Sequence, residues 1–489
     1  MSTTNAVTRF KLSQLPPSVQ WVLASLSLSM LLSSLGTSIA NVGLPTLSLA
    51  FHATFQQVQW VVLAYLLAIT TLIVSVGRLG DVIGRRRLML AGIVLFTVAS
   101  FLCGVAPTLW LLIAARALQG LGAAIMMVLT MAMISESVPK AKAGSAMGLL
   151  GTMSAMGTAL GPTLGGVLIA GFGWPAIFLI NVPLGILTFL LAYNYLPDDN
   201  KEPKAGRVRF DAMGTVMLVL TLAAYALALT TGRSSFSSTS LVFLLAAIVG
   251  AGLFLLVESR AASPLIPLAL FRNPTLSAGF AMSILVTTVV MATLVVGPFY
   301  LGGALSLDAA RVGLVMSAGP VVAALAGAPA GRLVDQFGAF RVSIVGLLGM
   351  LIGSITLPLL PTGLGVPGYI APLVFVTAGY ALFQAANNTA VMSDSTTANR
   401  GVLSGLLNLS RNLGLITGAS FMGAVFAFGA DTTSILTAHP VSVVAGMRIT
   451  FAVAAGLIFV ALAIAALGRA LAQRVTHHAR EKEKAHATT

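Results

Sequence analysis

The sequence predicts an all-α polytopic membrane protein with 14 transmembrane helices, arranged as two six-helix halves plus an inserted helix pair. Of its 489 residues, 57% are hydrophobic and only 8% are charged, whereas about 25% of the residues in a soluble domain are charged. Fourteen apolar segments follow one another along the chain. A glycine- and arginine-rich motif at residues 77–87 recurs at residues 331–341, which indicates an internal duplication.

The apolar segments have the length of membrane-spanning helices, because about 20 apolar residues cross a bilayer. They are too long for barrel strands and lack the period-two alternation of such strands. Frequent Gly and Pro residues do not argue against helices, because membrane helices tolerate both. We therefore expect spans of roughly 20 residues at 21–44, 58–79, 88–106, 109–134, 146–171, 176–196, 212–231, 239–257, 276–301, 312–331, 341–360, 368–392, 402–428 and 448–471.

The Lys and Arg residues predict which side of the membrane each connection faces. If the N-terminus lies inside, the inner connections and tails hold 22 of the 27 basic residues, and the outer connections hold only Arg233, Arg311 and Arg448. This distribution follows the positive-inside rule, so both termini are expected in the cytoplasm. The net charge of +14 then matches an anionic inner leaflet and excludes a nucleic-acid partner.

Two further motif pairs extend the duplication. Ser135–Ser137 ends the fourth segment as Ser393–Ser395 ends the twelfth, and the pair Gly157 and Gly161 of the fifth segment recurs in the thirteenth. Segments 1–6 therefore match segments 9–14. The expected parts are a cytoplasmic N-terminus (1–19), a first half (20–196), a charged linker with the extra helix pair (197–275), a second half (276–472) and a cytoplasmic tail (473–489).

Six motifs lie along the chain in a fixed order, at Asn41–Pro45, Gln59–Tyr65, Gly77–Arg87, Leu112–Gly122, Gly157–Gly166 and Ile177–Pro183. Together they resemble motifs of the major facilitator superfamily and, within it, of the fourteen-helix drug:proton antiporter group. The resemblance covers essentially the whole chain. It implies the major facilitator fold, and parallel six-helix halves place a substrate path at their interface near the middle of the membrane.

The motif at 77–87 places one acid among several arginines at the end of the second segment. A carboxylate there can accept hydrogen bonds from helix amides and pair with an arginine. In the family that it resembles, this loop holds the two halves together in the outward-facing state; a basic anchor on the inner leaflet is the alternative. The expected gating residues are Gly77, Asp81, Gly84, Arg85, Arg86, Arg87, Gly331, Asp335, Gly338 and Arg341.

Two arginines lie inside apolar segments, where a charge costs roughly 2.5–3.5 kcal/mol and normally faces a polar cavity or partner. The resemblance implies a part in proton coupling or cavity electrostatics for Arg116, with Gln119 one turn away. An arginine bonded to the carbonyls of a broken helix is the structural alternative. For Arg411, the sequence supports a functional role and a structural role equally.

A stripe of glycines marks the fifth segment. Gly157, Gly161 and Gly165 recur every four residues, so another helix can lie close against them, and Pro162 removes a backbone donor. The resemblance implies that this stripe, which continues to Gly166, is a rocking interface of antiport. Tight helix packing alone is the alternative.

Candidate substrate-lining residues are polar or aromatic positions in the spans. Antiporters of this group commonly carry an aspartate five residues before Asn41, where this chain has Gly36. No acid lies deep in a predicted span, so an anionic or neutral amphiphile fits as well as a cation. Proton coupling then needs a helix-end acid such as Asp81, Glu136 or Asp394, or a histidine. The expected lining residues are Gly36, Asn41, Trp60, Tyr65, Gln384, Asn387 and Asn388. For the three amides of the twelfth segment, hydrogen bonds that only join helices are the alternative.

The sequence therefore predicts a secondary active transporter that exports amphipathic organic compounds across a bacterial inner membrane by proton antiport. No nucleotide-binding, zinc-ligand or nucleophile motif appears, so we expect no catalytic residue, metal or cofactor beyond the proton gradient. The expected partners are the lipid bilayer and a small amphipathic substrate. The protein is expected to be a monomer, and periplasmic adaptor proteins are candidate partners. The alternatives are a dedicated exporter or uniporter of one metabolite or organic anion, and a non-transporting receptor or lipid-handling protein.

Overall fold

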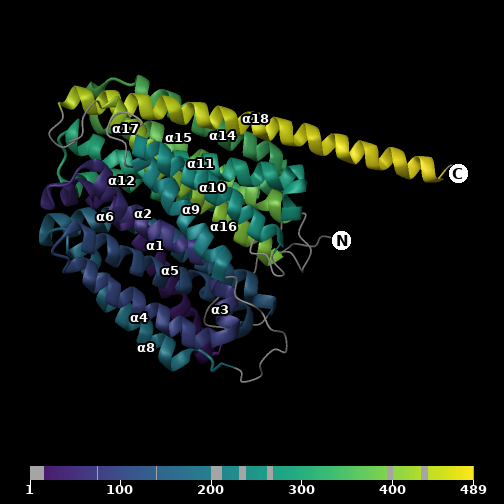
Figure 1. The fold of residues 1–489 in the computed structure, drawn as a ribbon, viewed down its shortest axis with the longest axis horizontal. Helices are drawn as coiled ribbons and strands as arrows, with labels where there is room; N and C mark the ends of the chain where they lie inside the picture. The colour runs from purple at the N-terminus through teal and green to yellow at the C-terminus, as the bar shows by residue number, and fades with distance from the viewer. Residues whose placement is uncertain are drawn as a thin grey trace, which may run out of the picture.

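The computed structural model describes residues 16–73, 75–138, 140–199, 212–230, 238–260, 268–393, 400–430 and 439–487. Within these residues the chain forms helices and connecting turns and no strand. Fourteen helices are long and apolar enough to cross a membrane, as the sequence predicts (Figure 1). The protein is therefore an all-α, multi-pass membrane protein.

The first half and the extra pair follow one another in chain order. In the first span, Pro17 occupies the first helical turn, where its missing N–H is not needed. A capping box between Thr54 and Gln57 begins the second span. The elements are α1 (Pro17–Ala50), α2 (Phe55–Leu72), α3 (Val76–Ile83), α4 (Arg85–Gly104), α5 (Leu109–Ser137), α6 (Lys140–Phe172), α7 (Ala176–Leu179), α8 (Asn181–Tyr195), α9 (Ala212–Thr230) and α10 (Ser238–Arg260).

The second half repeats this order of spans. Asn273 begins it by accepting a hydrogen bond from the backbone N–H of Thr275 at 2.9 Å, as an N-cap residue does. The elements are η2 (Leu268–Arg272), α11 (Pro274–Gly303), α12 (Ala309–Met316), α13 (Ala318–Phe337), α14 (Ala339–Leu359), η3 (Thr362–Leu364), α15 (Gly365–Ser393), α16 (Arg400–Thr417), the π-helical turn η4 (Gly418–Met422), α17 (Gly423–Gly429) and α18 (Pro440–Ala487).

Five spans differ from the continuous helices that the apolar pattern predicts. Two of them are the sixth, which divides into α7 and α8, and the thirteenth, in which η4 separates α16 from α17. The second span divides into α2 and α3, and the tenth divides at Ser317 into α12 and α13. Pro320 explains the break in the tenth span, because it has no N–H for the carbonyl one turn earlier. The last span continues beyond residue 473, where the sequence predicts a tail, and α18 extends far from the bundle in Figure 1. Residues 470–487 contain no Gly or Pro and are rich in helix formers.

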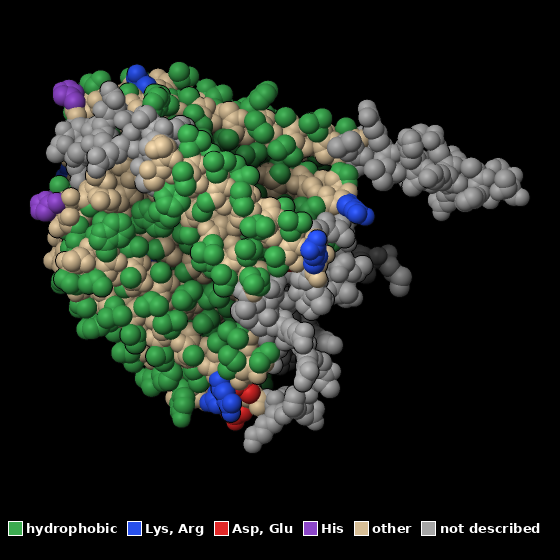
Figure 2. Space-filling view, viewed as in Figure 1, with side chains coloured by type: hydrophobic (Ala, Val, Ile, Leu, Met, Phe, Trp, Pro, Cys, Tyr) green, Lys and Arg blue, Asp and Glu red, His purple; other side chains and the backbone are tan. Residues whose placement is uncertain are grey.

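The bundle has two ends. We call the end where Gly84 and Gly338 join their helices the loop end, and the opposite end the far end. Gly84 has φ 106° and Gly338 has φ 82°, so both junctions use a conformation that favours glycine. In Figure 2 the middle of the visible face is mainly apolar, and most of the basic side chains in view lie toward the loop end.

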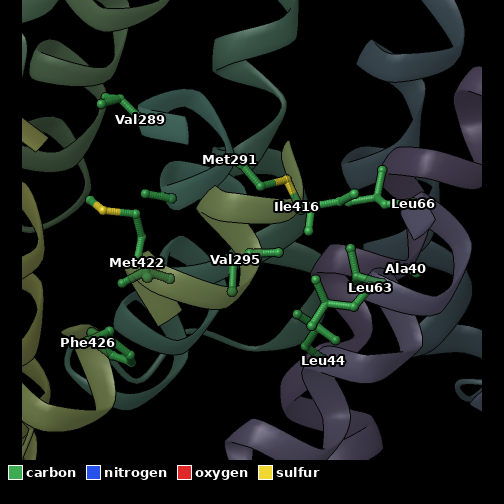
Figure 3. Packing of buried hydrophobic residues seen from close by; sticks show 14 of the residues in the cluster. Ala40, Leu44, Leu63, Leu66, Val289, Met291, Val295, Ile416, Met422 and Phe426 are labelled. Atoms are coloured by element: carbon green, nitrogen blue, oxygen red, sulfur yellow. The ribbon is translucent and has the colours of Figure 1, made fainter. Parts of the chain in front are cut away.

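At the far end the two halves are packed together. Phe55 of α2 contacts Phe299 and Phe426 of the second half, with ring centroids 4.7 and 5.6 Å away. Figure 3 shows Leu63 and Leu66 of the first half facing residues of the second within one buried cluster. This packing seals the far end.

The extra pair lies at the seam between the halves. Trp60 of α2 donates from Nε1 to the hydroxyl of Thr230 in α9 at 3.1 Å. On the other side, the hydroxyl of Tyr225 in α9 lies 3.2 Å from that of Thr417 in α16. Helix α9 therefore contacts both halves.

Candidate functional site

A cavity of about 190 Å³ lies in the second half, between α11, α15 and α16, on the side of the loop end. Two helix faces supply most of its wall. Residues 380, 384, 387 and 388 of α15 share one face, as do residues 404, 407, 408 and 411 of α16, because side chains three and four apart lie one above another. The polar lining residues are Ser283, Thr287, Tyr380, Gln384, Asn387, Asn388, Ser404, Asn408 and Arg411.

The three amides predicted to line a cavity do lie on its wall, together with Arg411. Asn387 also joins helices, because its Nδ2 donates to the carbonyl of Gly279 in α11 at 3.1 Å. For Gln384 and Asn388, no side-chain hydrogen bond occurs within the described part of the chain. Their amides therefore face the cavity with bonding capacity left over.

Arg116 lies elsewhere, enclosed within the first half with no exposed surface. Its Nε donates to the carbonyl of Val61 at 2.9 Å and one Nη to the carbonyl of Gly36 at 3.1 Å. The other Nη donates to Oε1 of Gln119 at 2.5 Å, and Gln119 donates to the hydroxyl of Ser100 at 2.7 Å. The guanidinium thus ties α5 to α1 and α2 and does not line the cavity. It bonds to carbonyls as in the structural alternative, but those carbonyls belong to the continuous helices α1 and α2 and not to a broken helix.

Four predicted lining residues of the first half are also outside the cavity. Gly36 is buried, and a Cβ there would meet the hydroxyl of Tyr65 at 2.8 Å. Tyr65 is itself enclosed and donates to the carbonyl of Ser33 at 2.7 Å. Asn41 is 1% exposed, and Trp60 is bound to α9. The structure therefore does not bring these four side chains to the cavity wall, because helix packing occupies them.

Most of the glycine stripe packs within one half. A Cβ on Gly157 would meet the carbonyl of Leu31 in α1, and one on Gly161 would meet Ser38. The second half repeats this packing, where a Cβ on Gly414 would meet the carbonyl of Ile284. Gly165 likewise faces α1. These glycines are in place for close α1–α6 packing within the first half.

Of the four predicted stripe glycines, only Gly166 has a position from which a Cβ would point at the other half. A Cβ there would lie 2.6 Å from the carbonyl of Ala309 and 2.9 Å from Cα of Gly313 in α12. A Cβ on Gly313 would lie 2.4 Å from the carbonyl of Pro162. The far-end contact between α6 and α12 is therefore made by backbone against backbone.

The loop after α3 is attached to the end of α8. Asp199 accepts hydrogen bonds from the backbone N–H groups of Arg86 at 2.8 Å and Arg87 at 3.3 Å. The guanidinium of Arg86 forms an ion pair with Asp198 and donates to the carbonyl of Tyr193 at 2.6 Å. All these contacts stay within the first half. Asp198 and Asp199 carry no sequence motif, although two adjacent acids are unusual in a chain with 13 acids.

The second copy of the motif shows no comparable clamp among the described residues. Gly77 and Asp81 belong to α3, and the side chain of Asp81 lies outside the described residues, as do those of Glu136 and Asp394. In the second copy, Gly331 and Asp335 end α13 and Arg341 begins α14. The side chains of Asp335 and Arg341 are exposed. For Arg85, the structure places the residue in the first turn of α4.

Gly84→Ala is expected to lower the stability of the protein by about 1–3 kcal/mol, because a φ of 106° is strained for alanine. We expect a further loss of stability from a steric clash with Asp199. A Cβ at Gly84 would collide with the carboxylate of Asp199. Gly338→Ala is the matched control, since its φ is also positive but its Cβ would meet nothing within 4 Å. Thermal unfolding in detergent should show the larger loss for Gly84→Ala. Equal losses would mean that Asp199 plays no part in holding the loop.

Two buried polar residues were not among the predicted site residues. Gln59, 1% exposed, donates from Nε2 to the carbonyl of Ala419 in the π-helical turn η4 at 3.0 Å, across the two halves. Glu258 of α10 is 2% exposed. It lies in the last turn of its helix, in agreement with the prediction that no acid lies deep in a span. The apolar pattern ends just before Glu258, whereas the helix continues to Arg260.

Fourteen spans, a polar cavity toward one end and a seal at the other define a membrane transport protein and not an enzyme. Residues 26–419 match the Major Facilitator Superfamily. The chain belongs to this superfamily.

Three relatives are similar over most of their length. The chain is 33% identical to the uncharacterized transporter YebQ of Escherichia coli, covering 84% of this chain and 92% of that protein. It is 29% identical to the riboflavin transporter RibZ of Clostridioides difficile, over 90% and 95% of the two chains. It is 31% identical to the multidrug resistance protein Stp of Mycobacterium tuberculosis, over 83% and 75%.

The fold also matches a solved structure. A bacterial homolog of the human lysosomal transporter Spinster, in an inward-facing and unoccupied conformation, superposes with a TM-score of 0.69. The match covers 93% of this chain and 97% of that one at 15% identity. At this identity the likeness concerns the fold alone.

Proposed function

We propose that this protein exports small amphipathic organic compounds by proton antiport with alternating access. The observation that supports this proposal most directly is the polar cavity on the loop-end side of a bundle whose far end is sealed. A transporter in this arrangement receives its substrate from the side that the loop end faces. The positive-inside rule makes this side the cytoplasm, with both termini there, in a bacterial inner membrane.

Alternating access then requires the far-end seal to open while the loop end closes, with the halves rocking about the cavity. The relative Stp, named a multidrug resistance protein, supports a drug-like substrate. The proton gradient serves in place of a cofactor, and Glu258 joins Asp81, Glu136 and Asp394 among the carboxylates that can carry the proton. The protein acts as a monomer in the bilayer, with periplasmic adaptor proteins as candidate partners.

Cells that express the protein are expected to expel an amphipathic dye faster than cells without it, and a protonophore should abolish the difference. The reason is that antiport draws its energy from inward proton flow. Dye retention is measured by fluorescence in both cell lines, with and without the protonophore. Efflux that persists unchanged with the protonophore would contradict proton coupling. Equal retention in the two cell lines would contradict export of that dye class.

A second candidate is dedicated transport of one metabolite or organic anion. The observation that favours it is the size of the cavity, since about 190 Å³ is below the roughly 300–1,000 Å³ of pockets for drug-sized ligands. The relative RibZ, named a riboflavin transporter, is an example of a single-substrate relative. A third candidate, a receptor or lipid-handling protein on this fold, predicts ligand binding without flux in proteoliposomes.

A further inference from the structure

The two halves differ in chemistry at matching positions around the cavity. Gly157 packs on the carbonyl of Leu31 as Gly414 packs on that of Ile284. In the first half, Ser154 stands three residues before Gly157 and Ser34 stands three residues after Leu31. The hydroxyls of these two serines lie 2.8 Å apart. This hydrogen bond joins α1 to α6.

The second half has the cavity at the corresponding place. Three residues before Gly414 stands Arg411, and three residues after Ile284 stands Thr287. Both line the cavity. An arginine has thus replaced one member of a serine pair, and its side chain is exposed.

The facing helix shows the same difference. Aligned on the motifs at 135–137 and 393–395, Gln384 and Asn387 of α15 correspond to Met126 and Leu129 of α5. Met126 and Leu129 have no exposed surface and belong to the apolar core. At these two positions the second half therefore carries amides where the first half carries core side chains, whereas Asn388 corresponds to the buried polar Thr130.

The chemistry of this wall favours a negatively charged ligand. Among the described residues that line the cavity, Arg411 alone is charged, and no carboxylate of the described part of the chain pairs with it. Three further donors line the wall and make no side-chain hydrogen bond within the described residues, so they can donate to an oxyanion. They are the amides of Gln384 and Asn388 and the hydroxyl of Tyr380. A guanidinium binds a carboxylate through two parallel hydrogen bonds.

The size and the apolar part of the wall limit the ligand further. A cavity of about 190 Å³ is slightly larger than the roughly 150 Å³ that holds a benzene molecule. Phe383, Leu407 and Met392 supply apolar contacts beside the polar groups. One aromatic ring with a carboxylate fits this space, and a larger substrate must extend out of it toward the loop end.

We propose that this cavity is a specificity site for an organic anion, in which Arg411 pairs with the oxyanion of an aromatic acid or of a similarly sized acidic head group. Gln384 and Asn388 donate further hydrogen bonds to the oxyanion, and the apolar wall holds the ring. The proposal rests on the transport function proposed above and names its substrate class. It also assigns the selectivity to the second half alone.

The test compares three ligands of one shape: 4-fluorobenzoate, 4-fluorobenzamide and 4-fluorobenzamidine, which are an anion, a neutral amide and a cation. Binding to the purified full-length protein is measured by fluorine NMR line broadening. The wild type is expected to bind the anion about tenfold or more tightly than the cation, in keeping with the strength of charge-assisted hydrogen bonds. Arg411→Gln should remove this preference, and Arg411→Lys should restore part of it.

Arg448→Gln is the matched control. Arg448 is exposed at the opposite end of the second half, in the first turns of α18, so this variant removes the same charge outside the cavity. Its anion preference should equal that of the wild type. Equal binding of all three ligands by the wild type, or an unchanged preference in Arg411→Gln, would overturn the proposal.

The result of this ligand-binding test can be distinguished from the result of the dye-efflux test of transport. An anion preference that depends on Arg411, without dye efflux from cells, would uphold the binding site and count against export. Protonophore-sensitive efflux of a cationic dye, by a protein that binds the three ligands equally, would uphold export and reject the anion site.

Discussion

Gly313→Val is expected to reduce transport at least tenfold by preventing closure of the far end. A Cβ at this position would lie 2.4 Å from the carbonyl of Pro162 and 2.9 Å from Cα of Gly166. Both are backbone atoms of α6, so no side chain can move aside, and the helices must separate. Overpacking costs about 1–3 kcal/mol, and each 1.4 kcal/mol is about tenfold in an equilibrium. The sealed state is therefore depleted about tenfold to a hundredfold.

Gly171→Val is the matched control, because it makes the same substitution in α6 where a Cβ would meet nothing within 4 Å. Dye efflux reports transport. Electron paramagnetic resonance between spin labels at Phe172 and Val441, exposed far-end residues of the two halves, reports closure. The distance should lengthen in Gly313→Val and stay unchanged in the control. Normal efflux with an unchanged distance would show that this contact is not needed for closure.

The sequence predicted the number of spans because an apolar run long enough to cross a bilayer has no other stable location. It could not predict the breaks in the second and tenth spans, since the apolar pattern continues through Ser75 and Ser317. The burial of Glu258 was not predicted either, because its helix continues past the last apolar residue. Pattern thus gives the existence of a helix more securely than its ends.

The amides of α15 could be predicted because three of them on one side of an apolar helix need a polar environment. The partners of Arg116 could not, because the carbonyls of Val61 and Gly36 lie in other spans and every residue has a carbonyl. The same holds for Asp199, which bonds to the backbone of Arg86 and not to a recognisable side-chain motif. Backbone partners leave no trace in the sequence.

The network around Arg116 leads to the largest expected change in stability. Arg116→Met keeps an unbranched side chain but removes three donated hydrogen bonds, to Val61, Gly36 and Gln119. Each buried acceptor left without its donor costs about 1–3 kcal/mol. The two carbonyls lie in helices and keep helical partners, so the lower part of this range applies to them. The total loss is therefore about 3 kcal/mol, a large fraction of the stability of a typical protein.

Arg116→Lys separates the structural role from a role in proton coupling. Lysine keeps the charge but replaces the planar fork with a single ammonium group, which cannot reach all three acceptors in the same geometry. If the role of Arg116 is structural, Arg116→Lys should also be less stable than the wild type, although more stable than Arg116→Met. Transport should then fall in proportion to the amount of folded protein. Thermal unfolding in detergent and transport per folded molecule are the two measurements. If Arg116→Met unfolds like the wild type and yet transports nothing, the arginine acts in the transport cycle and not in holding α1, α2 and α5 together.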